Sequence, residues 1–136
     1  MNDILASLLI LASNFSQYEP VSSSPILTPQ SHQQLITTLC QGKECNALAY
    51  YDDKSQTIFY DERLKASSTI AQGFIVHELV HFLQHQHSVV PDNASCEERI
   101  SLEREAYQVQ QRFLHSRHMN TIEITMAVKM LSNACQ

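Results

Sequence analysis

Residues 68–85 read STIAQGFIVHELVHFLQH. The run contains no proline and a single glycine, and its apolar residues recur at helical spacing, which predicts an α-helix. Ser67 or Ser68 can cap its N-terminus. Between Phe74 and Leu83 two histidines and a glutamate stand in an otherwise apolar sequence, and buried polar groups need partners. The segment therefore predicts a core helix that carries a polar site.

The polar residues of this helix form the pattern HExxH, with His77, Glu78 and His81. Residues four apart lie on one helix face, so the two imidazoles can bind one zinc ion. Glu78 borders that face, where a carboxylate can take a proton from a zinc-bound water. The spacing predicts one Zn²⁺ cofactor, with Glu78 as general base. The alternative is a histidine pair that packs on the helix without a metal.

A catalytic zinc usually has three protein ligands. Two residues, one histidine and one glutamate, are candidates for the third ligand. The first is His87, which stands where the metzincin pattern HExxHxxGxxH has its last histidine. Residue 84 is glutamine, whereas that pattern has a glycine that lets the chain leave the helix. A helix that continues past Gln84 carries His87 away from the metal, which disfavours this candidate.

The second candidate is Glu103, in the segment Glu103-Arg-Glu-Ala-Tyr107. This segment resembles the E-x-x-A/S-D segment of gluzincins, in which the leading glutamate is the third zinc ligand. The resemblance implies that His77, His81 and Glu103 hold the metal. Tyr107 replaces the aspartate that supports a zinc-binding histidine in gluzincins, and its hydroxyl could serve instead. Helical periodicity alone does not separate Glu103 from its neighbour Glu105.

The likeness extends over about two-thirds of the chain. The runs YYDD at 50–53 and TIFY at 57–60, followed by HELVHFLQ and EREAY, are similar to small secreted HExxH proteins in a domain family of unknown function. In gluzincins the strand before the HExxH helix is the sheet edge that pairs with an extended substrate. The resemblance implies that residues 57–60 form this edge; the alternative is an ordinary hairpin strand.

The remaining sequence predicts an α+β fold with four to five helices and a small β-hairpin or short antiparallel sheet beside the HExxH helix. Helices are expected at residues 3–15, 68–85, about 95–115 and through 124–131, with a capping box of Ser95 and Glu98. Residues 25–27 predict a short strand, Thr28-Pro29 predicts the start of another helix, and 47–51 with 57–60 predicts a hairpin. We expect one zincin-like domain over 1–136, with a helix and connector at 1–24 and the metal-site core at 25–136.

Charge and hydropathy exclude several classes of protein. The formal net charge is −5 and the nine basic residues are scattered, which disfavours a nucleic-acid partner. Apolar residues make up 43% of the chain, which favours a packed globule over disorder. No run of 18 apolar residues occurs, so no membrane span is expected. Residues 4–12 fit a signal-peptide core or an amphipathic helix; we favour a helix of the mature domain, with any signal upstream.

Four cysteines and no CxxC pair favour two disulfides and a secreted or periplasmic location. Cys40 and Cys45 flank a short loop with Gly42, so a bridge there is sterically easy. Cys96 opens one helix, and Cys135 follows the next helix, which should run antiparallel to it. The sequence therefore predicts Cys40–Cys45 and Cys96–Cys135; four free thiols are the alternative.

The most specific function that these patterns favour is zinc-dependent hydrolysis, most simply by a small gluzincin-like metallopeptidase acting on peptides. Tyr107, Tyr60 and His85 are the candidates for stabilising an oxyanion. A zinc-bearing binding or structural domain with little catalysis is the second hypothesis, and a metal-free helical interaction domain is the third. The sequence does not predict the substrate or the oligomeric state.

Overall fold

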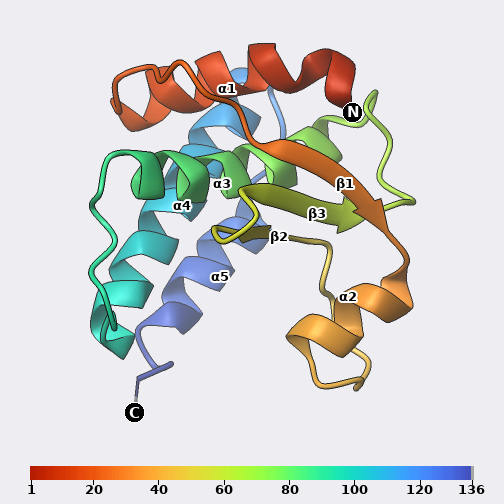
Figure 1. Cartoon of the computed structure of the whole chain (residues 1–136), viewed down its shortest axis with the longest axis vertical. Coiled ribbons are helices and arrows are strands. Elements are labelled where there is room, and N and C mark those ends of the chain that lie inside the picture. The colour runs from red at the N-terminus through yellow and green to blue at the C-terminus, as the bar shows by residue number, and fades with distance from the viewer. Residues whose placement is uncertain (136) are drawn as a thin grey trace.

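The computed structural model describes residues 1–135, in which the strands lie in the first half of the chain and three helices follow them (Figure 1). Within the described residues 1–135, five helices and three strands confirm the prediction of an α+β fold. In chain order they are α1 (Asn2–Ser16), β1 (Ile26–Gln30), α2 (His32–Leu39), β2 (Ala49–Asp52), β3 (Thr57–Asp61), α3 (Thr69–Gln86), α4 (Cys96–Ser116) and α5 (Ile122–Leu131).

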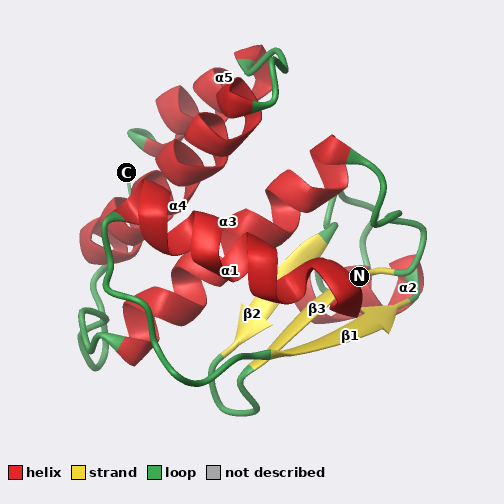
Figure 2. Ribbon diagram, turned by 90° about the horizontal axis from the view of Figure 1, so that it is seen from above, coloured by secondary structure: helices red, strands yellow, loops and turns green. Residues whose placement is uncertain are grey.

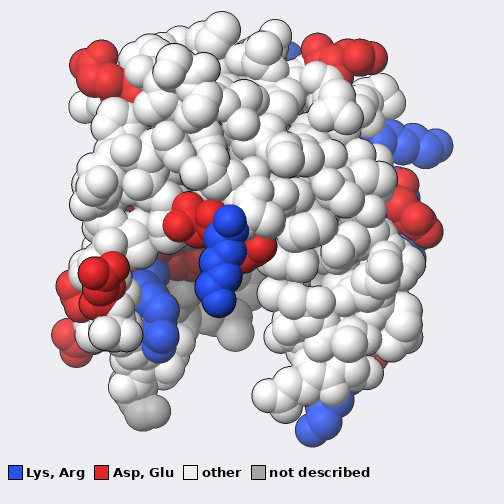
Figure 3. Space-filling model, in the orientation of Figure 1, with Lys and Arg blue, Asp and Glu red and all other residues white. Residues whose placement is uncertain are grey.

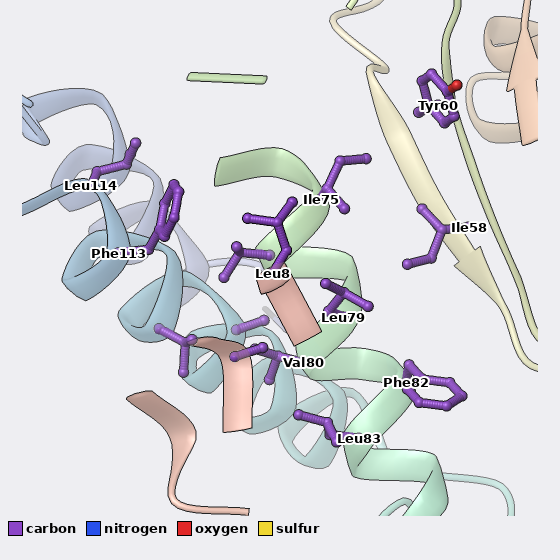
Figure 4. Close-up of a cluster of buried hydrophobic side chains, with 14 of the residues drawn as sticks. Leu8, Ile58, Tyr60, Ile75, Leu79, Val80, Phe82, Leu83, Phe113 and Leu114 are labelled. Carbon is purple, nitrogen blue, oxygen red and sulfur yellow. The ribbon is translucent and has the colours of Figure 1, made fainter. Parts of the chain in front are cut away.

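Helix α3, which carries the HExxH pattern, lies at the centre of the molecule. From Ile75 to Leu83 its apolar residues point in all directions and are fully buried, as expected of a helix segment that is covered on every side, whereas Ile70 in the first turn is exposed. Figure 4 shows α3 between Phe113 and Leu114 of α4 and the side chains of Ile58 and Tyr60 from β3. Helix α1 adds Leu8 to the same core. The site on α3 is therefore held by packing against several elements.

The ends and contacts of α3 follow from its sequence. The Ser68 hydroxyl accepts a hydrogen bond from the Ala71 N–H, which confirms the predicted cap. Gly73 faces α4, and a methyl group there would lie 3.2 Å from the side chain of Leu114. The glycine thus allows the close approach of α3 to α4, the helix that bears Glu103.

The sheet has the order β1-β3-β2, with β2 and β3 antiparallel and β1 and β3 parallel. The hairpin predicted from residues 47–60 is confirmed. The implied role of 57–60 as the edge strand is wrong, because β3 is paired on both sides. The edge next to α3 is β2.

The helix start predicted at Thr28-Pro29 is also wrong. Both residues lie in β1, where Thr28 pairs with Phe59 and Pro29 with Tyr60. Proline is tolerated there because β1 is an edge strand, on which a missing N–H can face away from the ladder. Helix α2 starts three residues later, where Ser31 and Gln34 form a capping box.

Helices α4 and α5 are joined at both ends. The Ser95–Glu98 capping box opens α4 as predicted, and both predicted disulfides are present. Cys96 and Cys135 have a Cα–Cα distance of 5.7 Å, and Cys40 and Cys45 one of 6.5 Å. The Cys96–Cys135 bridge ties the chain after α5 to the start of α4, so it limits the motion of α5.

Removal of the longer bridge should cost more stability than removal of the shorter one. In the chain-entropy model, Cys96→Ala with Cys135→Ala should lower the free energy of unfolding by about 4 kcal/mol, against about 2 kcal/mol for the Cys40–Cys45 pair. Urea denaturation of the two double variants measures the difference. Equal losses, or a larger loss for the short bridge, would contradict the expected role of Cys96–Cys135.

The surface carries little basic character. Figure 3 shows lysine and arginine side chains scattered over one face, with acidic side chains between them. None of the helices described within residues 1–135 combines the length and apolarity needed to cross a membrane. Figure 2 shows the sheet on one side of α3 and α5 on the opposite side of the molecule.

Candidate metal centre

Helices α3 and α4 bring the three predicted ligands together. His77 and His81 stand one turn apart on α3, with ring centroids 5.1 Å apart. The carboxylate of Glu103 on α4 lies between them, with Oε1 2.5 Å from His77 Nε2 and Oε2 3.1 Å from His81 Nε2. One ligand atom from each residue falls within 4.8 Å of the others. The geometry therefore unites residues that are far apart in sequence.

This donor set fits zinc. Two imidazole nitrogens and one carboxylate are ligands that zinc accepts, and three protein ligands leave a fourth position for a small molecule. Each histidine uses its other nitrogen in a hydrogen bond: His77 Nδ1 lies 2.9 Å from Gln110 Oε1, and His81 Nδ1 lies 2.8 Å from Gln84 Oε1. The Nε2 atoms of both rings are thus directed at Glu103, as metal ligation through Nε2 requires.

The two glutamines are functional candidates that the sequence reasoning missed. Gln84 is fully buried and Gln110 is nearly so. A buried amide needs hydrogen-bond partners, so a glutamine on the buried face of either helix indicates a polar contact with a neighbouring side chain. Gln84 stands one turn after His81, and Gln110 stands two turns after Glu103. This spacing places each glutamine on the same helix face as the predicted ligand of that helix.

Electrostatics in the metal-free chain couple Glu103 closely to the two histidines. Burial favours the neutral acid, but hydrogen bonds from His77 and His81 hold the pKa of Glu103 well below its usual range. Burial also opposes the charge on His81, yet its hydrogen bond with Glu103 and the nearby Glu78 raise the pKa of His81 to about 9. A cation that replaces the proton would satisfy the same carboxylate.

The carboxyl of Glu78 lies beside this cluster in a small cleft. The cavity has a volume of about 200 Å³ and is lined by the segment 46–49 before and into β2, together with residues of α3 and α4 that include His77, Glu78 and Glu103. Burial raises the pKa of Glu78, and the charge of Glu103 adds to the shift, although His77 and His81 oppose it. Glu78 is thus partly shielded from water and close to two of the candidate ligands.

Tyr107 contacts the site differently from the way the sequence suggested. Its ring packs edge-to-face on His77, with centroids 4.5 Å apart, and it lines the cleft. Gln110, not the Tyr107 hydroxyl, is hydrogen-bonded to His77. The reason is geometric, because the tyrosine one turn after Glu103 meets the imidazole ring edge-to-face. Of the three oxyanion candidates, Tyr107 lines this cleft, whereas His85 pairs with Asp53 and Tyr60 lies in β3.

The competing ligand candidates lie outside the cluster. His87 caps the end of α3, where its ring stacks on Tyr18 and its Nε2–H donates to the Glu19 carbonyl. The helix continues through Gln84, as the absence of a glycine predicted. Glu105 turns toward the Tyr18 hydroxyl and the Gln84 amide. Both residues therefore contact side chains and backbone around the site and are not among the three residues that converge on it.

A larger groove adjoins the cleft. Its volume is about 720 Å³, and most of its lining is apolar, from the first turns of α3, the second half of α4 and the start of α5. Phe74, Tyr107 and Gln110 line both hollows. The residues around Glu78 thus border a continuous surface that extends toward α5.

Comparison with known proteins places the chain in a family without assigning an activity. No curated protein matches it, and no solved structure matches it. A family model described as a domain of unknown function, DUF6647, matches residues 9–136 and so covers α3, α4 and the whole cluster. The chain therefore belongs to the DUF6647 family of domains of unknown function.

Proposed function

We propose that this protein is a zinc-dependent hydrolase, most simply a small metallopeptidase similar to gluzincins. The observation that carries the proposal is the meeting of His77, His81 and Glu103 within 4.8 Å of one another. Glu78 lines the cleft beside them. A donor set with an adjacent carboxylate in a cleft is the arrangement that metal-assisted hydrolysis needs.

Each residue has a distinct role in this proposal. His77, His81 and Glu103 hold one zinc ion, which when bound polarises a carbonyl and supplies a water nucleophile at neutral pH. Glu78 accepts the proton of the attacking water and returns it to the leaving amine. Gln84 and Gln110 orient the two imidazoles through the hydrogen bonds at Nδ1.

A zinc-bearing domain without catalysis is the second candidate. The observation that favours it is the volume of the cleft beside Glu78, about 200 Å³. Ligand pockets usually measure roughly 300–1,000 Å³. The adjoining groove of about 720 Å³ restores enough space for a peptide side chain, so we favour hydrolysis.

Metal analysis followed by a peptide screen tests the proposal. Protein purified without added zinc should contain about one zinc per chain, as one site of three ligands requires. A chelator should remove the metal, and added zinc should restore it. A mixture of unstructured peptides should then be cleaved by the zinc-loaded protein alone. Zinc binding without cleavage supports the second candidate, and absence of zinc binding would contradict both.

The groove predicts a preference among substrates. Peptides with phenylalanine or leucine next to the reacting bond should be cleaved at least about tenfold faster than peptides with serine or asparagine there, because an apolar pocket discriminates by roughly 1–3 kcal/mol per methylene. Ala127→Trp, which fills the groove, should remove this preference, whereas Lys129→Trp on the exposed face of α5 should keep it. Rates for the four peptides in both variants measure it. Unchanged selectivity in Ala127→Trp would exclude the groove from substrate binding.

The two disulfides support a secreted or periplasmic location as part of the proposal, because such bridges persist in oxidising compartments.

A further inference from the structure

A chain of partly buried hydrogen bonds connects the candidate ligand His81 with the connector that follows α1. The Tyr18 hydroxyl donates to Glu105 Oε1 at 2.5 Å, and Gln84 Nε2 donates to the same oxygen at 2.9 Å. Gln84 Oε1 lies 2.8 Å from His81 Nδ1. Tyr18 and His81 belong to segments far apart in sequence, so the contact is built by the tertiary fold.

The chemistry of the partners fixes the orientation of the Gln84 amide. An amide side chain can be turned over, and only its partners decide which end is the donor. Gln84 Nε2 faces two groups that can only accept, the Leu102 carbonyl at 2.9 Å and the Glu105 carboxylate. Each takes one of the two N–H bonds of the NH₂ group. The amide oxygen must therefore face His81.

That orientation fixes the tautomer of His81. An amide oxygen can only accept, so the proton of the hydrogen bond sits on His81 Nδ1. In the neutral imidazole that binds a metal, the free lone pair is then on Nε2, the atom that donates its proton to Glu103 Oε2 when no metal is bound. This is the tautomer that a metal ligand bound through Nε2 needs.

We infer that Tyr18, Glu105 and Gln84 are positioning residues that hold His81 in the tautomer and orientation required to bind zinc through Nε2. The inference rests on the proposed function, because it concerns the same zinc site. Glu105 acts through Gln84, and Tyr18 acts through Glu105. The connector after α1 therefore contributes to the metal centre without touching it.

Two further observations support a role for the connector. The ring of Tyr18 stacks on His87, with centroids 5.3 Å apart, and His87 Nε2–H donates to the Glu19 carbonyl at 2.8 Å. These contacts hold the Tyr18 hydroxyl against Glu105 even though Tyr18 lies outside any helix or strand. The end of α3 thus anchors the residue that completes the chain of hydrogen bonds.

A double-mutant cycle on zinc affinity tests the inference. Gln84→Met removes the hydrogen bond to His81 and should raise the zinc Kd by about 10–100-fold, the usual effect of losing a partner of a metal-binding histidine. Glu105→Gln leaves the Gln84 amide free to turn over and should raise the Kd by roughly tenfold. In the Gln84→Met background, Glu105→Gln should have no further effect, because its action passes through Gln84.

Controls separate positioning from general stability. Tyr18→Phe keeps the stacking ring and removes only the hydroxyl, so it should weaken zinc binding with little loss in the free energy of unfolding. Tyr50→Phe and Glu97→Gln remove a hydroxyl and a charge elsewhere and should leave the Kd unchanged. The visible spectrum of the cobalt-substituted protein should change in Gln84→Met and Glu105→Gln but not in the controls.

Each outcome decides the inference. A wild-type Kd in both Glu105→Gln and Tyr18→Phe would overturn it, and so would additive effects of Gln84→Met and Glu105→Gln. Failure of the wild-type protein to bind zinc would overturn the proposed function together with the inference. Zinc binding in the wild type with unaffected variants would overturn the inference alone. Should Gln84→Met fail to fold, Glu105→Gln and Tyr18→Phe still decide it.

Discussion

Replacement of Glu103 with alanine should weaken zinc binding by more than about 100-fold, the upper end of what loss of a partner outside the ligand set causes. The variant loses the one anionic ligand of the candidate set and leaves two neutral imidazoles. In the metal-free chain the same carboxylate lies within hydrogen-bond distance of both histidines, so nothing else in the cluster can replace it.

Competition with a chromophoric chelator measures the zinc Kd of the variant. Glu97→Ala, an exposed glutamate on the same helix, is the matched control and should keep the wild-type value. His87→Ala should weaken zinc binding far less than Glu103→Ala, because His87 is not among the candidate ligands and contacts the site only through Tyr18. A lower unfolding free energy with no change in zinc affinity would identify the cluster as an ion-pair network without a metal.

The helices were predictable because their signals are local. Residues 68–86 combine a serine cap with apolar residues on every face, and Ser95 with Glu98 forms a capping box; both features depend only on neighbours in sequence. The second half of strand β1 was predicted as a helix start for the opposite reason. Thr28-Pro29 has the local pattern of a helix start, and only its parallel pairing with β3 makes it a strand.

The candidate site likewise has a part that local spacing predicts and a part that only the packing of helices determines. His77, Glu78 and His81 lie within one helical turn, so their spacing alone predicts that they can act together. Glu103 comes from another helix, and periodicity did not distinguish it from Glu105; a resemblance to gluzincins was needed. The packing of α3 on α4 separates the two carboxylates, because Glu103 faces the histidines and Glu105 faces Gln84 and Tyr18.

The residues that hydrogen-bond to the candidate ligands, directly or through Glu105, could be identified only from the tertiary structure. Gln110 and Gln84 carry no motif, and their importance follows from burial and from the hydrogen bonds they make with the histidines. Tyr18 lies in a connector whose sequence shows only polarity and a proline. No local pattern predicts that its hydroxyl meets a carboxylate of α4, because that contact depends on how α1 packs on α3 and α4.

Replacement of Glu78 with glutamine should reduce peptide turnover by about 10²–10⁴-fold while the zinc Kd stays at the wild-type value. Glutamine has nearly the same shape as glutamate, but a neutral amide cannot accept the proton of the attacking water. Glu78 lines the cleft and is not among the three residues whose ligand atoms converge. The loss should therefore fall on kcat and leave metal binding intact. Glu62→Gln, an exposed glutamate after β3, is the control for the loss of one charge.

Stability distinguishes this role from a structural one. Burial raises the pKa of Glu78, so ionised Glu78 is less favourable in the folded chain than in the unfolded chain, and this cost is present above its ordinary pKa. A neutral glutamine removes the cost. The zinc-free Glu78→Gln variant should thus have an unfolding midpoint at neutral pH equal to or above that of the wild type, even as turnover is lost. A lower midpoint with proportional loss of zinc would mean that Glu78 supports the fold, whereas near wild-type turnover with intact zinc would exclude it as the general base.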